Sequence, residues 1–260
     1  MPFQQTGDIR YYTFNLLKEN GLFHAALTRN GGFSPDPWRS LNLGGTVGDE
    51  PARVRANKER VFTTLGCSIQ DIYDVWQVHS AEVVCVDEPR PFYDPHKKAD
   101  AILTNKPGVI LFMRFADCVP IVLYDPTQRV VGIVHAGWLG TVKQVAKAAI
   151  NRMDEVYGCK PENILAGIGP SIAAHHYPVG EDVAAHIRSS FGEDAASFLS
   201  GEDGRITFDL WEANRMLLQD AGVKQIEVSG ICTACHLEDW YSHRGEFGRT
   251  GRFGVIASIT

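Results

Sequence analysis

The sequence predicts a mixed α/β fold in one domain over residues 1–260, a layered structure in which mixed β-sheets are flanked by helices. Three observations lead to this prediction. The length of 260 residues suits one to two domains of about 150 residues, and no repeat, low-complexity tract or linker divides the chain. Apolar residues make up 44% and charged residues 22%, which is typical of a globular protein with a large core. Strand-like runs also alternate with helical periodicities.

The first half of the chain contains one expected helix followed by several strands. The helix covers about 52–65, and the strands cover 81–87, 109–115, 121–124 and 129–135. Asp125-Pro126 is a turn signal between the last two strands. Because these strands follow one another closely, they favour hairpins and a mixed sheet over a purely parallel one.

Helices dominate the pattern after residue 140. Thr141 and Gln144 form a capping box ahead of an apolar stripe that ends at Gly158. Asp209 and Glu212 form a second box ahead of another helix. A further helix is expected over about 181–191.

Charge and hydropathy exclude two classes of partner. The net charge of −6 argues against a broad basic surface for duplex DNA, and no apolar run is long enough for a membrane span. The N-terminus lacks the basic start and apolar segment of a signal peptide, so we expect a cytoplasmic protein whose six cysteines are reduced.

One cysteine and two histidines lie beside predicted strand ends, where α/β enzymes place their sites. Cys118, His79 and His135 supply one thiolate and two imidazoles, a three-ligand set that leaves the fourth position of a zinc ion for water or substrate. The same residues also suit a metal-free nucleophilic pair, with Cys118 attacking, either histidine as base and Asp117 as orienting residue. A third interpretation is that all three are buried structural residues. The residues alone leave these interpretations open.

A second cysteine motif lies near the C-terminus. Cys232-x-x-Cys235-His236 fits the haem attachment pattern, which we reject because no export signal is present. We expect two reduced structural thiols. We also expect the adjacent side chains of His175 and His176 to diverge, so that they share no metal, and we expect these two residues and His96 to be surface or lining residues.

Glycines interleave with arginines in the last stretch. Arg244, Arg249 and Arg252 form a basic cluster in which the guanidinium groups suit phosphate, although a solvated loop has the same composition. In the N-terminal part, residues 29–34 form a tight turn beside a basic residue and residues 40–44 follow it; plain turn chemistry also explains either stretch.

Taken together, an ordered set of motifs resembles the YfiH, or laccase-domain, family of purine nucleoside phosphorylases nearly from end to end. The motifs are Arg29-x-Gly-Gly-x-Ser34, Leu41-Asn42-Leu43-Gly44, Gln77-Val-His79, Ala99-Asp100-Ala101, Ala116-Asp-Cys118-Val-Pro120, Val134-His135-Ala-Gly-Trp138, Gly167-Ile-Gly169-Pro170 and Thr250-Gly-Arg252. The resemblance implies a layered α/β fold and one catalytic zinc on His79, Cys118 and His135. It also implies phosphorolysis of adenosine, inosine, guanosine and methylthioadenosine, with an associated adenosine deaminase activity.

Within this resemblance, substrate roles are expected for residues near the zinc. We expect Arg29, Arg244 and Arg252 to hold phosphate, and Asn42 and Gln77 to bond ribose or base. Asp117 is expected to contact substrate or to orient a ligand histidine. The chain departs from the usual family residues at Ser171, His176 and His243, which bears on substrate preference.

The family also carries an older label, copper-dependent polyphenol oxidase. A laccase needs several copper ions, and nine histidines without a His-x-His pair are few for them. One thiolate and two imidazoles with an open position suit zinc better, so copper is the weaker expectation. A metal-free thiol hydrolase and a non-enzymatic binding module remain as alternatives.

Overall fold

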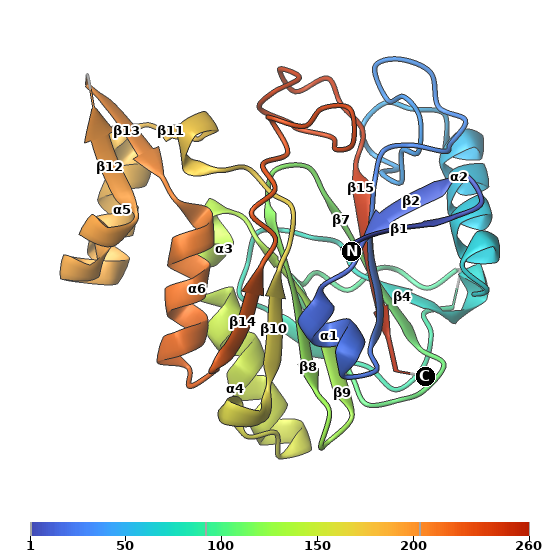
Figure 1. Ribbon diagram of the computed structural model, residues 1–260, viewed down its shortest axis with the longest axis horizontal. Helices are drawn as coiled ribbons and strands as arrows, with labels where there is room; N and C mark the ends of the chain where they lie inside the picture. Colours follow the sequence, from blue (N-terminus) through green and yellow to red (C-terminus); the bar gives the residue numbers. More distant parts are fainter. Residues whose placement is uncertain (1, 92, 203, 260) are drawn as a thin grey trace.

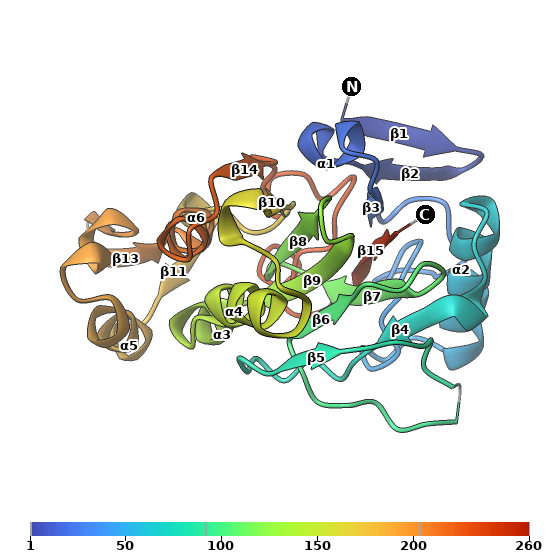
Figure 2. The same cartoon turned by 90° about the horizontal axis from the view of Figure 1, so that it is seen from below.

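Two six-stranded sheets lie face to face, and helices cover the outer face of each (Figures 1 and 2). This architecture comes from a computed structural model, which describes residues 2–91, 93–202 and 204–259. The layers follow the order α2, first sheet, second sheet, then α3, α4 and α6. The predicted mixed α/β class is therefore confirmed.

The first sheet has the strand order β1-β2-β3-β15-β7-β4. Its strands are β1 (Phe3–Thr6), β2 (Ile9–Tyr12), β3 (Phe23–Leu27), β4 (Ile72–Asp74), β7 (Ile110–Phe115) and β15 (Phe253–Ser258). All neighbours are antiparallel except β4 and β7. The last strand of the chain thus lies in the middle of this sheet.

The second sheet has the order β14-β10-β8-β9-β6-β5. Its strands are β5 (Val83–Cys85), β6 (Ala101–Thr104), β8 (Val119–Asp125), β9 (Val130–Ala136), β10 (Leu165–Ile168) and β14 (Gln225–Val228). Parallel pairs at β5–β6 and β10–β14 flank the antiparallel β8–β9 hairpin. The expected mixed sheet is present, and its hairpin turns at Asp125-Pro126 as predicted.

The helices are α1 (Asn15–Glu19), α2 (Pro51–Thr64), α3 (Trp138–Val142), α4 (Val145–Tyr157), α5 (Glu181–Phe191) and α6 (Leu210–Asp220). A small third sheet contains β11 (Pro178–Val179), β12 (Leu199–Glu202) and β13 (Arg205–Phe208), beside α5. No helix in the described ranges is both long and apolar enough to cross a membrane.

Strand β8 shows why buried strands of this chain have continuous apolar sequences. Ile121 and Leu123 pack toward the helices with the apolar stripe of α4, whereas Val122 packs between the two sheets. Both faces of the strand are therefore buried, which removes the polar alternation of a half-exposed strand.

The two capping predictions had different outcomes. Asp209 is the N-cap of α6 and its carboxylate accepts the N–H of Glu212 at 3.0 Å, as predicted. The Thr141 box is wrong, because Thr141 lies within α3 and α4 begins at Val145. Thr141 Oγ1 instead accepts a hydrogen bond from Asn214 Nδ2 at 2.9 Å, which ties α3 to α6.

Candidate metal centre and substrate site

Three segments bring His79, Cys118 and His135 together at one end of the sheets. His79 lies in the loop between β4 and β5, and His135 lies in β9. Cys118 directly precedes β8, where the chain crosses from the first sheet to the second. The hairpin register pairs Pro120 with His135, which brings Cys118 near that imidazole.

The spacing of the three side chains suits a zinc ion. One donor atom from each residue lies within 4.8 Å of the others, and Cys118 Sγ is 3.9 Å from His79 Nε2. Zn–S and Zn–N bonds of about 2.3 and 2.0–2.1 Å give a tetrahedral S···N edge of about 3.6 Å. A Cβ atom at Gly137 would lie 2.8 Å from Cys118 Sγ, so a side chain there would crowd this group.

Asp100 orients both histidines. His135 Nδ1 donates to Asp100 Oδ1 at 2.9 Å, which directs the other ring nitrogen, Nε2, toward Cys118. The same carboxylate accepts the backbone N–H groups of Val78, His79 and Ser80 at 3.2, 3.0 and 2.6 Å, and the Ser80 hydroxyl at 2.7 Å. One buried side chain therefore fixes the ring of His135 and the loop of His79.

These contacts also explain a strained backbone. His79 has φ +56° and Asp117 has φ +81°, both in the left-handed region that non-glycine residues seldom adopt. Three N–H bonds to Asp100 hold the His79 loop in this conformation. Strain of this kind is retained where surrounding contacts over-determine the geometry.

The surroundings of Cys118 and His135 favour a thiolate on Cys118 and a protonated imidazole on His135. Burial raises the pKa of the Cys118 thiol, but His135 and His79 outweigh burial and lower the pKa to about 6. Burial lowers the pKa of His135, but Cys118 and Asp100 outweigh it and raise the pKa to about 9. Burial also raises the pKa of Asp100, yet the hydrogen bonds from His135 and Ser80 bring it down to about 2. Cys118 is thus predisposed to the thiolate form that binds metal.

Asp117 anchors loops and does not contact either ligand histidine. Its Oδ1 accepts the hydroxyls of Thr233 and Ser242, each at 2.7 Å, and its Oδ2 accepts the Arg244 N–H at 2.6 Å. The expectation that Asp117 orients a histidine is wrong, because Asp100 has that role. Asp117 instead fixes the C-terminal loops beside Cys118.

Two arginines border the trio and carry unneutralised charge. Arg244 is exposed, lies over the Tyr177 ring at 5.0 Å and donates to Pro178 O. Arg252 donates through Nη1 to Gly251 O at 2.8 Å, and Cys118 and Asp117 raise the pKa that burial lowers. Within the described residues neither guanidinium forms an ion pair, in contrast to Arg29 with Glu246.

Asn42 and Gln77 use their amides inside the protein. Asn42 Oδ1 accepts from the N–H groups of Gly44 and Arg252, both at 2.9 Å, and its Nδ2 donates to Asp49 at 2.9 Å. Gln77 exchanges two hydrogen bonds with the backbone of Arg114, at 2.8 and 3.0 Å, in the manner of a neighbouring strand. Asn42 is fully buried and both its donors and its acceptor are paired, so its expected contact to ribose or base is corrected to a positioning role. The expected substrate contact of Gln77 stays a prediction, because its amide retains one N–H beyond these two bonds.

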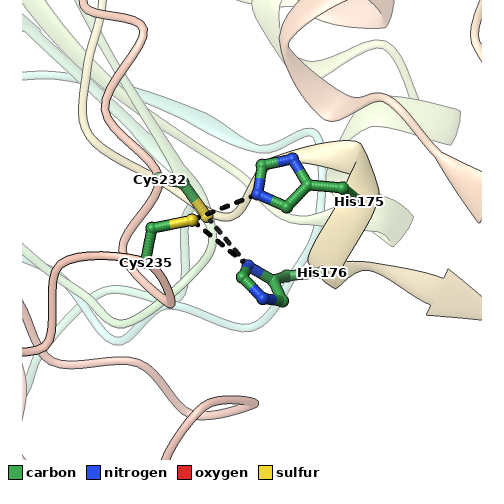
Figure 3. A group of neighbouring side chains, drawn as sticks. All are labelled: His175, His176, Cys232 and Cys235. Carbon is green, nitrogen blue, oxygen red and sulfur yellow. Dashed lines mark hydrogen bonds between the residues drawn. The ribbon is translucent and has the colours of Figure 1, made fainter.

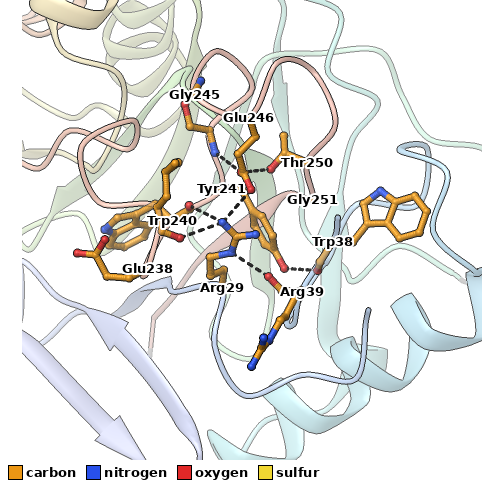
Figure 4. Close-up of polar contacts among 12 residues, drawn as sticks. Arg29, Trp38, Arg39, Glu238, Trp240, Tyr241, Gly245, Glu246, Thr250 and Gly251 are labelled. Atoms are coloured by element: carbon orange, nitrogen blue, oxygen red, sulfur yellow. Dashed lines mark hydrogen bonds and ion pairs between the residues drawn. The ribbon is translucent and has the colours of Figure 1, made fainter. Parts of the chain in front are cut away.

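Arg29 differs from expectation in the same way as Asn42 (Figure 4). Its Nε donates to Arg39 O, and its Nη1 donates to Leu237 O at 2.9 Å and to Glu246 Oε1 at 3.0 Å. Its guanidinium also lies 4.4 Å from the centre of the Tyr241 ring, and its side chain is 11% exposed. These contacts hold an N-terminal turn against the C-terminal loops and leave Arg29 poorly placed for phosphate.

Sequence reasoning missed Asp100, Gly137 and Tyr177 as parts of this region. Tyr177 is half-buried, and its pKa is raised by burial and by Cys118. Asp100 and Gly137 lie within motifs that carry the family resemblance, and this is the signal by which they could have been found.

A cavity of about 810 Å³ lies elsewhere, between α2 and residues 89–91, and none of the expected site residues lines it.

A second group of ligands corrects another expectation. The 3₁₀ turn Ala174–His176 places the rings of His175 and His176 4.6 Å apart, and both reach Cys232 or Cys235. The prediction that these rings diverge is therefore wrong, because it assumed extended or helical backbone.

Known proteins are similar to this chain over most of its length. Residues 23–260 match the family model described as multi-copper polyphenol oxidoreductase laccase. A purine nucleoside phosphorylase from Deinococcus radiodurans is 39% identical over 237 residues, covering 91% of this chain and 88% of that protein. Purine nucleoside phosphorylase YlmD from Bacillus subtilis is 38% identical over 234 residues, covering 86% and 84%. The crystal structure of YlmD from Geobacillus stearothermophilus matches with a TM-score of 0.92 at 30% identity, covering 99% and 98%.

Proposed function

Because this chain belongs to the family described as multi-copper polyphenol oxidoreductase laccase, whose curated relatives are named purine nucleoside phosphorylases, we propose that it is a zinc-dependent purine nucleoside phosphorylase. The proposed substrates are adenosine, inosine, guanosine and methylthioadenosine. The observation that supports this best is the convergence of one thiol and two imidazoles beside two arginines that have no ion-pair partner in the described ranges. Three protein ligands leave zinc a position open to substrate, as in catalytic sites.

The residues that would hold zinc are His79, Cys118 and His135. When bound there, zinc would supply a Lewis acid that stabilises negative charge developing on the reacting groups. Asp100 holds His135 by its Nδ1–H and so presents Nε2 to the ion. Both side chains of this pair are buried, with exposed fractions of 5% for His135 and 0% for Asp100.

Phosphorolysis exchanges one bond for another at the ribose. An oxygen of hydrogen phosphate forms a bond to C1′ while the C1′–N9 bond breaks, and the base leaves with the electron pair and gains the proton that hydrogen phosphate loses. We assign the phosphate to Arg252, whose charge interacts with Cys118, and to Arg244, which lies over the Tyr177 ring; both guanidinium groups can pair with phosphate oxygens. Arg29, Asn42 and Asp117 are assigned positioning roles, and Gln77 keeps its expected contact to ribose or base.

Adenosine deaminase activity is proposed as a side reaction of the same centre. In this reaction water attacks C6 of adenine instead of phosphate attacking C1′, the bond from C6 to the exocyclic nitrogen breaks, and ammonia leaves with a proton from the water. Copper oxidase chemistry is the weaker candidate, because a laccase needs several copper ions and the described residues contain only two groups with three or more potential metal ligands. A metal-free hydrolase is favoured by one observation, namely that His135 bridges Cys118 and Asp100 as in a nucleophilic triad.

The test is phosphate-dependent release of free base from each nucleoside, measured with the wild type and Cys118→Ala. Cys67→Ala is the matched control, since Cys67 is a half-buried thiol outside the site. We expect base release that requires phosphate and disappears only in Cys118→Ala. Release that survives complete removal of zinc would favour the thiol hydrolase, and full activity in Cys118→Ala would refute the site.

A further inference from the structure

Four potential metal ligands converge beside the candidate active site. His175 and His176 come from the 3₁₀ turn before β11, and Cys232 and Cys235 come from the loop after β14. Figure 3 shows both imidazoles directed at the two sulfur atoms from one side. Cys232 is buried, whereas the other three residues are exposed.

Hydrogen bonding does not account for this convergence. His176 Nδ1 lies 3.6 Å from Cys232 Sγ and 3.5 Å from Cys235 Sγ. A ring nitrogen offers one proton or one lone pair, so it cannot bond both sulfur atoms at full strength. A common partner placed among the donor atoms would satisfy all of them.

The distances fit a tetrahedral zinc ion. With Zn–S bonds of about 2.3 Å and Zn–N bonds of about 2.0–2.1 Å, S···N edges measure about 3.6 Å and the S···S edge about 3.8 Å. The two His176 distances of 3.5 and 3.6 Å match this edge, and His175 Nε2 lies 3.1 Å from Cys235 Sγ. All four donor atoms lie within 4.8 Å of one another.

We propose that His175, His176, Cys232 and Cys235 bind a second zinc ion, and that this site is structural. Four protein ligands fill the coordination sphere, unlike the three-ligand group around Cys118. The Ala173 N–H donates to Cys232 Sγ at 3.4 Å and so helps to fix the position of this sulfur atom. Coordination also gives a role to Cys235, which would otherwise be an exposed thiol open to oxidation.

The second zinc would join two loops that border the proposed substrate site. Ser171 already pairs with Cys232 through an isolated β-bridge, and the Ala173 N–H bonds Cys232 Sγ. Among the described residues, no backbone hydrogen bond joins 174–176 to the second loop. Thr233, next to Cys232, donates to Asp117, and Tyr177, next to His176, lies under Arg244. The ion would therefore hold Tyr177, on which Arg244 lies, close to Thr233, which bonds Asp117 beside Cys118.

Metal content tests the proposal without reference to activity. We expect the zinc-loaded wild type to contain two zinc ions per chain by elemental analysis, and both Cys235→Ser and Cys118→Ala to contain one, while Cys67→Ser keeps both. Cobalt substitution adds a spectroscopic readout. Cys118→Ala should retain the intense thiolate-to-metal bands of a two-thiolate tetrahedral site, and Cys235→Ser should lose most of that intensity.

A measurement on the unmodified chain covers the case in which Cys235→Ser fails to fold. Alkylation followed by peptide mapping should label Cys235 only after chelation, because coordination blocks the exposed thiol. One zinc ion in the wild type that Cys235→Ser retains, two in Cys235→Ser, equal labelling of Cys235 with and without zinc, or a Cys232–Cys235 disulfide in zinc-loaded protein would each overturn the second site. One ion that Cys118→Ala retains and Cys235→Ser loses would support the second site and count against the first.

Discussion

Replacing Asp100 with Asn removes the charge that orients the proposed catalytic ligands while keeping the side chain's size. In the native chain, Oδ2 accepts from Val78 N, Ser80 N and Ser80 Oγ, and Oδ1 accepts from His79 N and His135 Nδ1. An amide nitrogen donates and cannot accept. In either orientation of the Asn side chain, the amide nitrogen therefore faces the donors that bonded either Oδ1 or Oδ2, and those donors lose their acceptor.

The magnitude follows from the number of hydrogen bonds that the amide nitrogen cannot accept. The Ser80 hydroxyl can rotate to accept, so at least two N–H groups are left without an acceptor in either orientation. Hydrogen bonds to a charged partner contribute about 1.5–3 kcal/mol each, which gives a decrease of about 3–6 kcal/mol in the free energy of unfolding. Without the partner that orients His135, zinc binding should also weaken by about 10–100-fold.

Zinc competition against a chromophoric chelator and urea unfolding measure the two effects separately. Asp125→Asn is the matched control, since Asp125 is equally buried and its Oδ1 accepts from Thr127 and Gln128 within the β8–β9 turn. Asp100→Asn protein with wild-type zinc affinity would refute the orienting role. A decrease in zinc affinity as large in Asp125→Asn would show that the effect is general destabilisation.

Three further predictions concern residues around the centre and in the core. Arg252→Lys keeps the charge but loses the planar guanidinium, so we expect the phosphate KM to rise about tenfold while the nucleoside KM is unchanged; an unchanged phosphate KM in initial-rate assays would exclude Arg252 from phosphate binding. Glu246→Gln leaves the Arg29 guanidinium without its ion pair, which should lower the free energy of unfolding by about 1–3 kcal/mol with no change in phosphate KM; a selective change in that KM would restore Arg29 as a phosphate ligand. Burial lowers the pKa of His24 from 6.5 to about 4, and its Nε2 accepts the Phe14 N–H at 2.8 Å. The unfolded chain therefore takes up the proton first, and stability that is complete above about pH 6.5 is lost as the pH falls toward about 4, by about 3 kcal/mol. Urea unfolding of His24→Gln should lack this part of the pH dependence, and parallel curves for the two proteins would contradict the assignment.

Local sequence patterns predicted the elements whose signal is local. Residues 109–115 and 129–135 are apolar enough to indicate strands, and the structure has β7 and β9 there. Asp209 predicted an N-cap because its partner lies three residues away. Patterns of this range also located His79, Cys118 and His135 beside strand ends, where the structure brings them together.

The partners of buried amides and charges depend on contacts distant in sequence. Gln77 bonds to Arg114 and Asn42 to Arg252, and no local pattern distinguishes such an amide from one that faces a substrate. Arg29 is similar, since its acceptors Leu237 O and Glu246 Oε1 lie more than 200 residues away. The sequence did not predict that the rings of His175 and His176 converge, because this convergence requires a 3₁₀ turn for which the sequence has no signal.

The position of β15 inside the first sheet has a consequence for synthesis. Residues 253–258 insert between β3 and β7, so until they leave the ribosome no hydrogen-bonded ladder joins the N-terminal strands to the half of the sheet that contains β4 and β7. Asn42 likewise has no partner in Arg252 before that moment. A nascent chain can therefore form the β8–β9 hairpin early, whereas the phosphate side of the site is completed only after residues 252–258 have emerged. A premature stop a few codons before residue 253 would remove this last step from a chain that already carries all seven proposed zinc ligands.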